Sequence, residues 1–500
     1  MEYETMAAVD LGSNSFRLQV GRVVEDQIYP LDSLKETVRL ASGLTPEKLL
    51  DAASLRRGWE ALGRFGERIR SLNGKTVRAV ATNTLRVAKN AGEFLAGGEA
   101  ALGFPIEVIA GREEARLIYI GAAHSLPLAT HKRLVVDIGG GSTEFIIGKK
   151  AEPLLTDSLY MGCVGYTLRY FPDGRIDKKR LREAQSAAAK EVELIAHAYM
   201  QQGWKEVVGS SGTARAIADL LELNHLNRGN VAGITREGLE KLANLLIKAG
   251  SIYALNIPGS RADRLPVLPG GLAIMLAIFD ELDLTYMGYA DGALRLGVLY
   301  DLLGRFQQND MRDATVKQFA RRYQVERKQA VRVRQTSLEI LRRLTAGRQS
   351  EEETQFLAWA ATLHEIGISV AHNSYHKHGA YILTCADMPG FSNKDRSLLA
   401  LLVLGHRGKL EKLSVSPDDL LVWRMVFCLR LAVLLHRSRD DRALPQYGVE
   451  AMPKGVLLEM PARWLADNPW TAAALKEEIL AWRQAGFTLK LKSAGAERGG

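Results

Sequence analysis

An internal repeat constrains the fold of this chain more than any other feature of its sequence. The segment VDLGSNSF, from Val9 to Phe16, recurs 127 residues later as VDIGGGSTEF, from Val136 to Phe145. Each copy begins at the end of a short apolar segment typical of a strand, and a second strand-like segment follows it. Two related halves of this kind are expected to place two hairpins face to face across a cleft.

The order of elements predicts α/β layers over about the first 300 residues. Strand-like segments are short, apolar or β-branched, and end at Gly, Pro, Asn or charged residues; they lie at 7–9, 18–20, 77–80, 106–109, 134–136, 145–147 and 206–208. Helical patterns lie between them, for example at 47–70, 112–124, 178–201 and 235–249.

From about residue 305 onward the pattern changes to amphipathic or buried helices. Helices are predicted at 312–345, 351–368, 392–406 and 418–437, and strands at 455–459 and 487–491. A chain of 500 residues is long enough for three or four domains at roughly 100–200 residues each. We predict an α/β domain at 1–124 with the first turn, a second at 125–304, a helical domain at 305–445 and a small α+β region at 446–500.

The two Gly- and Ser-rich turns predict a phosphate site. Turns without bulky side chains let backbone N–H groups approach phosphate oxygens closely, and serine hydroxyls can donate as well. The predicted phosphate-binding residues are Gly12, Ser13, Asn14, Ser15, Gly139, Gly140, Gly141 and Ser142. Asp10 and Asp137 lie at strand ends, where carboxylates can hold Mg²⁺ directly or through water.

Several motifs identify a family resemblance. The paired motifs DLGSNSF and DIGGGSTEF resemble the phosphate loops of the actin and sugar-kinase superfamily, and more narrowly those of the exopolyphosphatase and guanosine pentaphosphate phosphohydrolase family. The resemblance runs through nearly the whole chain and includes ATNTLR at 81–86, GREEARLIYIG at 111–121, MGCV at 161–164, GSSGTARA at 209–216, PGGLAI at 269–274 and DGALRLGVLY at 291–300. It implies two actin-like (ribonuclease H-like) α/β domains and a hydrolase.

Glu114 is the candidate catalytic base. Helical spacing places it over Leu117 and Ile118, the side of the helix with a buried pattern, whereas Glu113 shares its side with Arg116. The simpler interpretation of both glutamates is favourable charge at a helix N-terminus. The family resemblance maps the catalytic glutamate onto Glu114, and a carboxylate beside a water can take its proton as the water attacks phosphorus.

Arg86 and Glu144 complete the predicted site. Arg86 follows the strand-like segment 77–80, so its guanidinium can bind phosphate bidentately; the alternative is a pair with a surface carboxylate. The resemblance favours a metal role for Glu144, held through water, whereas an outward-facing strand residue is the structural alternative. The turn around Ser211 and Thr213 contacts adenosine in the wider superfamily, but it is equally consistent with simple helix capping.

The C-terminal half resembles an HD-type metal phosphohydrolase domain around His364. Glu365 replaces the signature aspartate, and Arg327-Lys328 stands where the first ligand histidine is expected. Because a metal site needs its full ligand set, we predict an HD-like scaffold without catalysis. Twelve Lys or Arg against four Asp or Glu between Arg305 and Arg348 predict polyanion binding; the candidate residues are Arg321, Arg322, Arg327 and Lys328.

Composition excludes some classes of protein. Three widely separated cysteines without CxxC spacing favour a reducing compartment. The start of the chain does not match a signal peptide, and no apolar stretch is long enough for a membrane span. A cytoplasmic protein is therefore expected. Only two aromatic residues lie in the basic stripe, which argues against a nucleic-acid partner. A homodimer would lengthen the cationic path.

The resemblance and the site together predict a Mg²⁺-assisted exopolyphosphatase. Glu114 would activate water, and the products would be orthophosphate and a polyphosphate chain one unit shorter. Gly141 and Asp291 favour this branch of the family over its alternative, the 5′-phosphohydrolase of guanosine pentaphosphate. A non-catalytic polyphosphate or nucleotide sensor and an actin-like kinase remain as alternatives of other classes.

Overall fold

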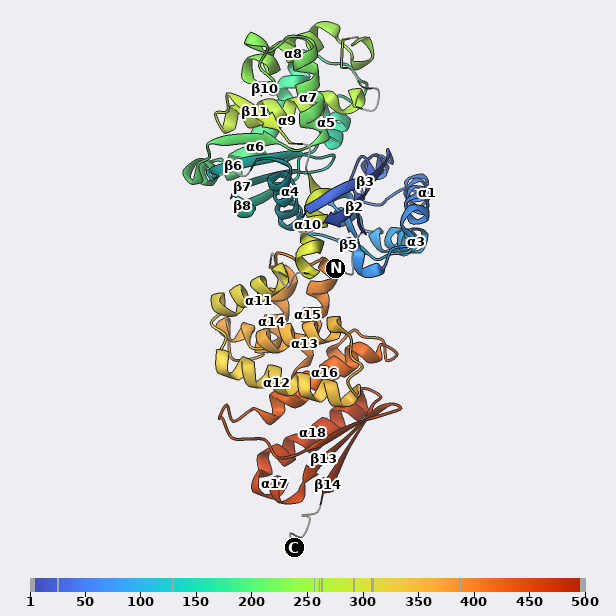
Figure 1. The fold of residues 1–500 in the computed structure, drawn as a ribbon, viewed down its shortest axis with the longest axis vertical. Helices are drawn as coiled ribbons and strands as arrows, with labels where there is room; N and C mark the ends of the chain where they lie inside the picture. The colour runs from blue at the N-terminus through green and yellow to red at the C-terminus, as the bar shows by residue number, and fades with distance from the viewer. Residues whose placement is uncertain are drawn as a thin grey trace. The chain divides into compact units, whose positions relative to one another are not determined.

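The computed structural model describes residues 5–24, 27–127, 130–255, 257–259, 261, 264–290, 293–306, 310–386 and 388–494. Asp291, which bears on the choice between the two branches, lies outside them. The chain forms two compact units, Met1–Met311 and Arg312–Gly500 (Figure 1). The finer boundaries at 124, 304 and 445 stay predictions.

The first sheet of the first unit begins with the predicted hairpin. Its strands are β1 (Thr5–Leu11), β2 (Phe16–Val24), β3 (Gln27–Glu36), β4 (Val77–Ala81) and β5 (Ile106–Val108), in the order β3-β2-β1-β4-β5. The first three strands are antiparallel, and β4 and β5 run parallel to β1. Strand β3 was not predicted.

The second sheet repeats this arrangement. Its strands are β6 (Lys132–Ile138), β7 (Thr143–Lys149), β8 (Glu152–Leu159), β9 (Glu206–Gly209), β10 (Ile234–Thr235) and β11 (Tyr286–Tyr289), in the order β10-β11-β9-β6-β7-β8. Asp137 pairs with Glu144 as Asp10 pairs with Arg17. Even the register shifts correspond, at Val20/Gly21 and at Ile147/Gly148. The internal repeat therefore extends from sequence to hydrogen-bond register.

Helices cover both sheets. They are α1 (Ala52–Ile69), α2 (Asn83–Val87), α3 (Ala91–Leu102), α4 (Gly111–Ser125), α5 (Cys163–Tyr170), α6 (Lys178–Gln202), α7 (Gly212–Leu223), α8 (Arg236–Ala249), α9 (Leu268–Glu281) and α10 (Leu294–Phe306). Helices α1 and α3 pack their aromatic side chains, Phe65 and Phe94, into the core of the first half. Helix α9, which is apolar on nearly every side, fills the core of the second half.

Helices α4 and α10 join the two halves. Residues of both sheets and both helices form one shared hydrophobic core, which includes Val80, Ile118, Ile146 and Val298. The helices cross almost backbone to backbone: a Cβ added to Gly297 would lie 1.7 Å from the carbonyl oxygen of Leu117. Only glycine fits at this crossing, so α4 is held tightly at the boundary of the halves.

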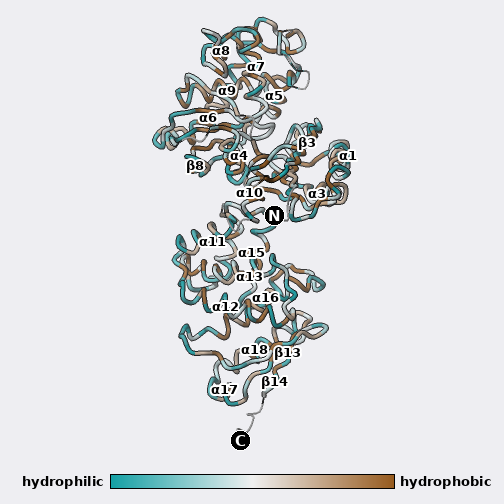
Figure 2. Tube along the Cα trace, in the orientation of Figure 1, coloured by the Kyte–Doolittle hydropathy of each residue, from teal (hydrophilic) through white to brown (hydrophobic). Residues whose placement is uncertain are grey.

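The second unit is helical and ends in a three-stranded sheet. Its elements are α11 (Met311–Arg322, which starts at the unit boundary), α12 (Arg327–Leu344), α13 (Glu351–Leu363), α14 (Tyr375–Cys385), α15 (Asn393–Gly405), α16 (Leu420–Leu435), β12 (Gly448–Met452), β13 (Gly455–Pro461), α17 (Ala462–Asp467), α18 (Pro469–Gln484) and β14 (Thr488–Ala494). Along α16 the trace is mostly hydrophobic, whereas α12 alternates (Figure 2). In the described part of the chain, no helix has the length and apolar character needed to cross a membrane.

Two helix predictions in this unit are wrong in extent. The predicted helix 312–345 is two helices, because the chain turns at Gln324, which has a φ of 53°. The amide of Val325 donates to Ala320 O at 2.9 Å, which closes the end of α11. The predicted helix 351–368 ends as an α-helix at Leu363 and continues only as a 3₁₀ turn, Ile366–Ser369.

The close crossing predicts that Gly297→Ala destabilises the first unit. The added methyl group would collide with the backbone of α4, and overpacking of this kind costs about 1–3 kcal/mol or more. The free energy of unfolding from denaturant titration measures the effect. Gly63→Ala is the matched control, because nothing lies within 4 Å of a Cβ there and alanine stabilises a helix interior by about 0.5–1 kcal/mol. Equal effects of the two substitutions would contradict the crossing.

Candidate active site

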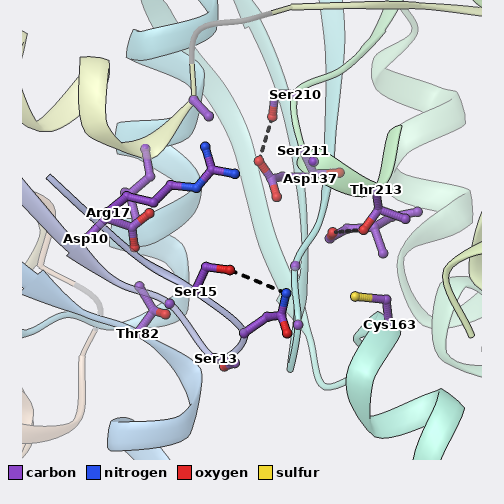
Figure 3. Close-up of a pocket in the computed structure, with 18 of the residues that line it drawn as sticks. Asp10, Ser13, Ser15, Arg17, Thr82, Asp137, Cys163, Ser210, Ser211 and Thr213 are labelled. Carbon is purple, nitrogen blue, oxygen red and sulfur yellow. Dashed lines mark hydrogen bonds between the residues drawn. The ribbon is translucent and has the colours of Figure 1, made fainter. Parts of the chain in front are cut away.

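A cleft of about 500 Å³ lies between the two halves of the first unit. Its lining includes both Gly- and Ser-rich turns, at 12–15 and 139–142, together with Asp10, Asp137 and Glu114. In Figure 3, Asp10, Ser13, Ser15 and Arg17 face Asp137, Ser210 and Thr213 from the opposite half. The structure therefore brings the two predicted hairpins to one cleft.

The two turns approach one another closely. A Cβ added to Gly140 would lie 3.0 Å from Ser13 Cβ and 3.2 Å from Asn14 N. At Gly141 it would lie 2.5 Å from Asn83 Oδ1. These glycines let the turns meet, and small side chains leave the backbone accessible to a ligand. The opposed turns are suited to holding one phosphate group from two sides.

Glu114 lies in the first turn of α4 and reaches the cleft. Its side chain is buried, and its Oε2 accepts a hydrogen bond from Arg86 Nη1 at 3.2 Å. Burial raises the pKa of Glu114 to about 7, Arg86 opposes the rise, and Asp10 and Asp137 add to it. A carboxyl group with a pKa near neutrality suits a general base at physiological pH.

Arg86 lies behind Glu114 and is not among the residues that line the cleft. Its Nη1 donates to the carbonyl oxygen of Ile109 at 2.9 Å as well as to Glu114. The carboxylate it pairs with is buried, not on the surface as the structural alternative supposed. In this arrangement Arg86 positions Glu114, and its predicted contact with phosphate stays a prediction.

Three further carboxyl groups lie around the two Gly- and Ser-rich turns. Burial raises the pKa of Asp137 to about 6 and that of Asp10 above its ordinary value. Glu144 is buried, so it is not the outward-facing residue of the structural alternative. Ser158 Oγ donates to it at 2.8 Å, and burial, followed by Glu114 and Asp137, raises its pKa well above the ordinary value.

This donor set fits a divalent cation. Burial raises the pKa of all four carboxyl groups, and neighbouring carboxyl groups add to the rise for Glu114, Asp137 and Glu144. A cation bound among them would favour their ionised forms. Carboxylate oxygens are the ligands that Mg²⁺ prefers. Asp10 and Asp137 line the cleft and would hold the ion, with Glu144 behind them. Across the described residues, no three His, Cys, Asp or Glu side chains are already arranged for a metal. A small ligand set completed by water and phosphate oxygens is typical of Mg²⁺.

Sequence reasoning missed all the basic residues that line the cleft. Six line it: Arg17, Lys35, Arg215, Arg261, Arg264 and Arg295. Burial, and then Arg295, lowers the pKa of Arg17 to about 10. Arg17 and Arg295 repel each other, and an anion bound in the cleft would relieve this repulsion. Arg17 had a detectable signal, because it occupies the place in the first copy of the repeat that Glu144 occupies in the second.

The turn around Ser211, which follows β9, caps helix α7 and contributes to the lining of the cleft. Ser211 caps α7, since its hydroxyl accepts from the amide of Ala214 at 3.1 Å. Thr213 Oγ1 donates to Ile138 O at 2.9 Å, and Ser210 Oγ donates to Asp137 at 2.8 Å. The capping interpretation is confirmed for Ser211. These residues also line the cleft, where they hold the turn at 139–142 and Asp137 in place.

The predicted polyanion-binding residues lie in the second unit. Arg321, Arg322, Arg327 and Lys328 are exposed around the break between α11 and α12. Other basic residues of the predicted stripe are engaged: Arg332 pairs with Asp441 and Arg343 with Glu339. The formal charge of the stripe therefore overstates what a ligand would meet. His364 is fully buried and its Nδ1 lies 2.7 Å from Ala361 O.

Comparison with known proteins decides the family. The family model described as "Ppx/GppA phosphatase family" matches residues 19–306, and that described as "Ppx/GppA phosphatase, domain III" matches 311–479. The chain belongs to the Ppx/GppA phosphatase family. A relative from Aeromonas hydrophila, named guanosine-5′-triphosphate,3′-diphosphate pyrophosphatase, is 36% identical over 494 residues, which is 98% of this chain and 99% of the relative. A relative of the same name from Pseudoalteromonas translucida is 37% identical over 97% of each chain.

Solved structures support the fold of this Ppx/GppA protein. The structure of an exopolyphosphatase from Cytophaga hutchinsonii has a TM-score of 0.54 and 23% identity, and covers 60% of this chain and 98% of its own. The predicted family and the actin-like α/β fold are confirmed. Membership indicates a hydrolase. The narrower expectation of an exopolyphosphatase is not confirmed, because the relatives that match nearly the whole chain carry the guanosine nucleotide name.

The crowded carboxyl groups predict that Mg²⁺ stabilises the protein. Saturating Mg²⁺ should raise the free energy of unfolding by about 1–3 kcal/mol, because a ligand that binds only the folded state stabilises that state. Asp137→Asn should remove this gain, yet stabilise the metal-free protein, because one repelling charge is lost. Thermal unfolding with and without Mg²⁺ measures both. Glu240→Gln, at an exposed position on α8, is the control and should respond like the wild type; loss of the gain there would contradict a site in the cleft.

Proposed function

We propose that this protein hydrolyses the 5′-terminal phosphate of guanosine 5′-triphosphate 3′-diphosphate. The observation that carries the proposal is the pair of phosphate turns closing on one cleft that Glu114 also reaches. The names of relatives matching 97–98% of this chain support the nucleotide over polyphosphate. Polyphosphate, the substrate expected from the motifs, serves as the comparison substrate.

The charge of the cleft supports a substrate with several phosphate groups. Six basic and three acidic side chains line it, and none of the six basic ones belongs to the two turns. A single terminal phosphate needs fewer cations than this. The guanidinium of Arg215 also lies 5.8 Å from the ring centroid of Tyr289. The cleft is therefore suited to hold the remaining phosphates of the nucleotide as well.

The proposed reaction is direct attack by water. The turns at 12–15 and 139–142 hold the terminal phosphate, and Glu114 orients a water and takes its proton. The bond between the terminal phosphorus and its bridging oxygen breaks, which releases orthophosphate and guanosine 5′-diphosphate 3′-diphosphate. Bound Mg²⁺ would neutralise charge on the phosphate oxygens. Catalysis here rests on positioning and charge stabilisation.

Glu114→Gln tests the proposal. The amide keeps the shape of the side chain but cannot accept a proton, so the rate should fall by about 10²-fold or more, while the nucleotide still binds. Phosphate release from guanosine pentaphosphate and from long-chain polyphosphate, side by side with and without Mg²⁺, is the measurement. Glu113→Gln is not a clean control, because Glu113 pairs with Arg116 in the core; Glu240→Gln is. A non-catalytic sensor would release no phosphate from either substrate.

Arg86→Gln should shift the pH dependence of the rate. Arg86 lowers the pKa of Glu114, which is about 7 with this arginine in place. Without it the pKa rises, so the ionised base is populated only at higher pH. The acid limb of the rate profile should therefore move to higher pH, and part of the lost rate should return as pH is raised. A uniform loss at all pH values would assign Arg86 to phosphate binding instead.

Three narrower points belong to the proposal. Long anionic substrates are proposed to bind four exposed basic residues of the second unit, Arg321, Arg322, Arg327 and Lys328.

Mg²⁺ is proposed as the physiological metal. A cytoplasmic homodimer is proposed as the working form, in keeping with a nucleotide or polyphosphate substrate and without a nucleic-acid partner.

A further inference from the structure

A second hollow, separate from the cleft, lies between α5 and α6 in the first unit. Its volume is about 900 Å³. It is lined by Tyr166, Arg169 and Tyr170 of α5, and by one face of the first half of α6 that carries Lys178, Lys179, Arg182, Glu183, Ser186, Ala187, Lys190 and Glu191. We call this surface the α5–α6 groove. It shares no residue with the lining of the cleft.

The groove is strongly basic, and its cations are not paired with acidic side chains among the described residues. Five basic and two acidic side chains line it. All five basic side chains are exposed, and among the described residues none of them forms an ion pair. Arg180, on the same helix but outside the groove, pairs with Asp173 and Asp177. Arg180, beside the groove, is therefore paired with acidic side chains, whereas the cations inside the groove are not.

The placement of these cations works against the stability of α6. Lys178, Lys179 and Arg180 occupy the first turn, which contains no acidic residue, although the helix dipole disfavours positive charge there. Lys178 and Arg182 are four residues apart, a spacing at which like charges repel across a helix surface. Asp173 and the N-cap residue Asp177 compensate Arg180, whereas Lys178 and Lys179 form no ion pair among the described residues. Unpaired cations at this position are expected where a ligand supplies the missing negative charge.

We infer that the α5–α6 groove is a second binding site for an anion that carries several consecutive phosphate groups. From Lys178 to Lys190 the basic face of α6 is roughly 18 Å long, at a rise of 1.5 Å per residue. That length suits a row of phosphates better than a single orthophosphate. The face of Tyr170 is already covered by Arg169, whose guanidinium lies 5.2 Å from the ring centroid. The groove is therefore expected to recognise its ligand mainly by charge and not by stacking on an aromatic ring.

Helix α5 links the groove to the second phosphate turn. The amides of Cys163 and Val164, at the start of α5, donate to Gly139 O and Gly140 O at 2.9 and 3.0 Å. A Cβ added to Gly162 would lie 2.4 Å from the backbone of Gly140. Tyr166, Arg169 and Tyr170 lie on the same short helix. A ligand in the groove therefore contacts the element that supports residues 139–142.

The test is hydrogen–deuterium exchange of the full chain with tripolyphosphate, with guanosine 5′-triphosphate, or with orthophosphate at equal ionic strength. Glu114→Gln is the background, so that the probe is not consumed. We expect slower exchange over 163–190 with at least one of the first two probes, and the effective probe identifies the source of the phosphates. No protection with either, or equal protection with orthophosphate, would overturn the site.

Two triple variants complete the experiment. Lys179→Ala, Arg182→Ala and Lys190→Ala together should abolish the protection; they should fold, because they remove unpaired charges from a helix surface. Arg56→Ala, Arg70→Ala and Lys248→Ala change the net charge equally at exposed positions outside the groove and should keep it. Protection that persists in the first triple variant would overturn the proposal. The readout does not use activity, so it can fail independently of the proposed function.

Discussion

A buried cluster of charged side chains holds the start of α4, and the position of Glu114 depends on it. Arg78 of β4 donates to Asp301 of α10 at 2.7 Å, and Arg116 bonds both Glu113 at 2.7 Å and Asp301 at 2.5 Å. Burial acts to raise the pKa of Asp301, yet Arg116, Arg78 and Arg305 hold it well below its ordinary value. Removing one partner of such a pair leaves a buried charge uncompensated, at a cost of about 3–5 kcal/mol.

This cluster and the glycine crossing act on the same two helices. Gly121 and Gly297 fix the distance between α4 and α10, and the ionic contacts fix their rotation. Glu113 faces this cluster, so its neighbour Glu114 is turned toward Arg86 and the cleft. The adjacent glutamates therefore have different roles: one joins the halves, and the other serves the site between them.

The sequence predicted the parts of the fold that its repeat and its apolar runs describe. The hairpins after Asp10 and Asp137, and all seven strand segments, were found where expected. Strand β3 was missed because it is a mostly exposed edge strand that contains Pro30, and such strands lack the apolar alternation of core strands. The break at Gln324 was missed because helical periodicity continues across it, and only tertiary packing of Tyr323 and Val325 against the core favours the turn.

The candidate site was predictable where the chain is locally distinctive, and not where distant residues converge. Glu114 and the two turns carry recognisable motifs. Arg261 and Arg264 lie in a segment without a motif and reach the cleft only because the second half folds back on β9. The environment of Glu114 was equally inaccessible, since the rise of its pKa comes from burial together with Asp10 and Asp137, which are distant in sequence.

The two kinds of charge in the cleft explain each other. Burial raises the pKa of all four carboxyl groups, and burial together with the neighbouring Arg295 lowers that of Arg17. A phosphate chain with a divalent cation satisfies both sets, because the cation neutralises the acids and the phosphates neutralise the bases. Arg86 favours the ionised form of Glu114, which would serve as the base of the proposed reaction. A divalent cation bound with the proposed substrate would favour the ionised form of Glu114, which would link cation binding to the ionisation of the proposed base.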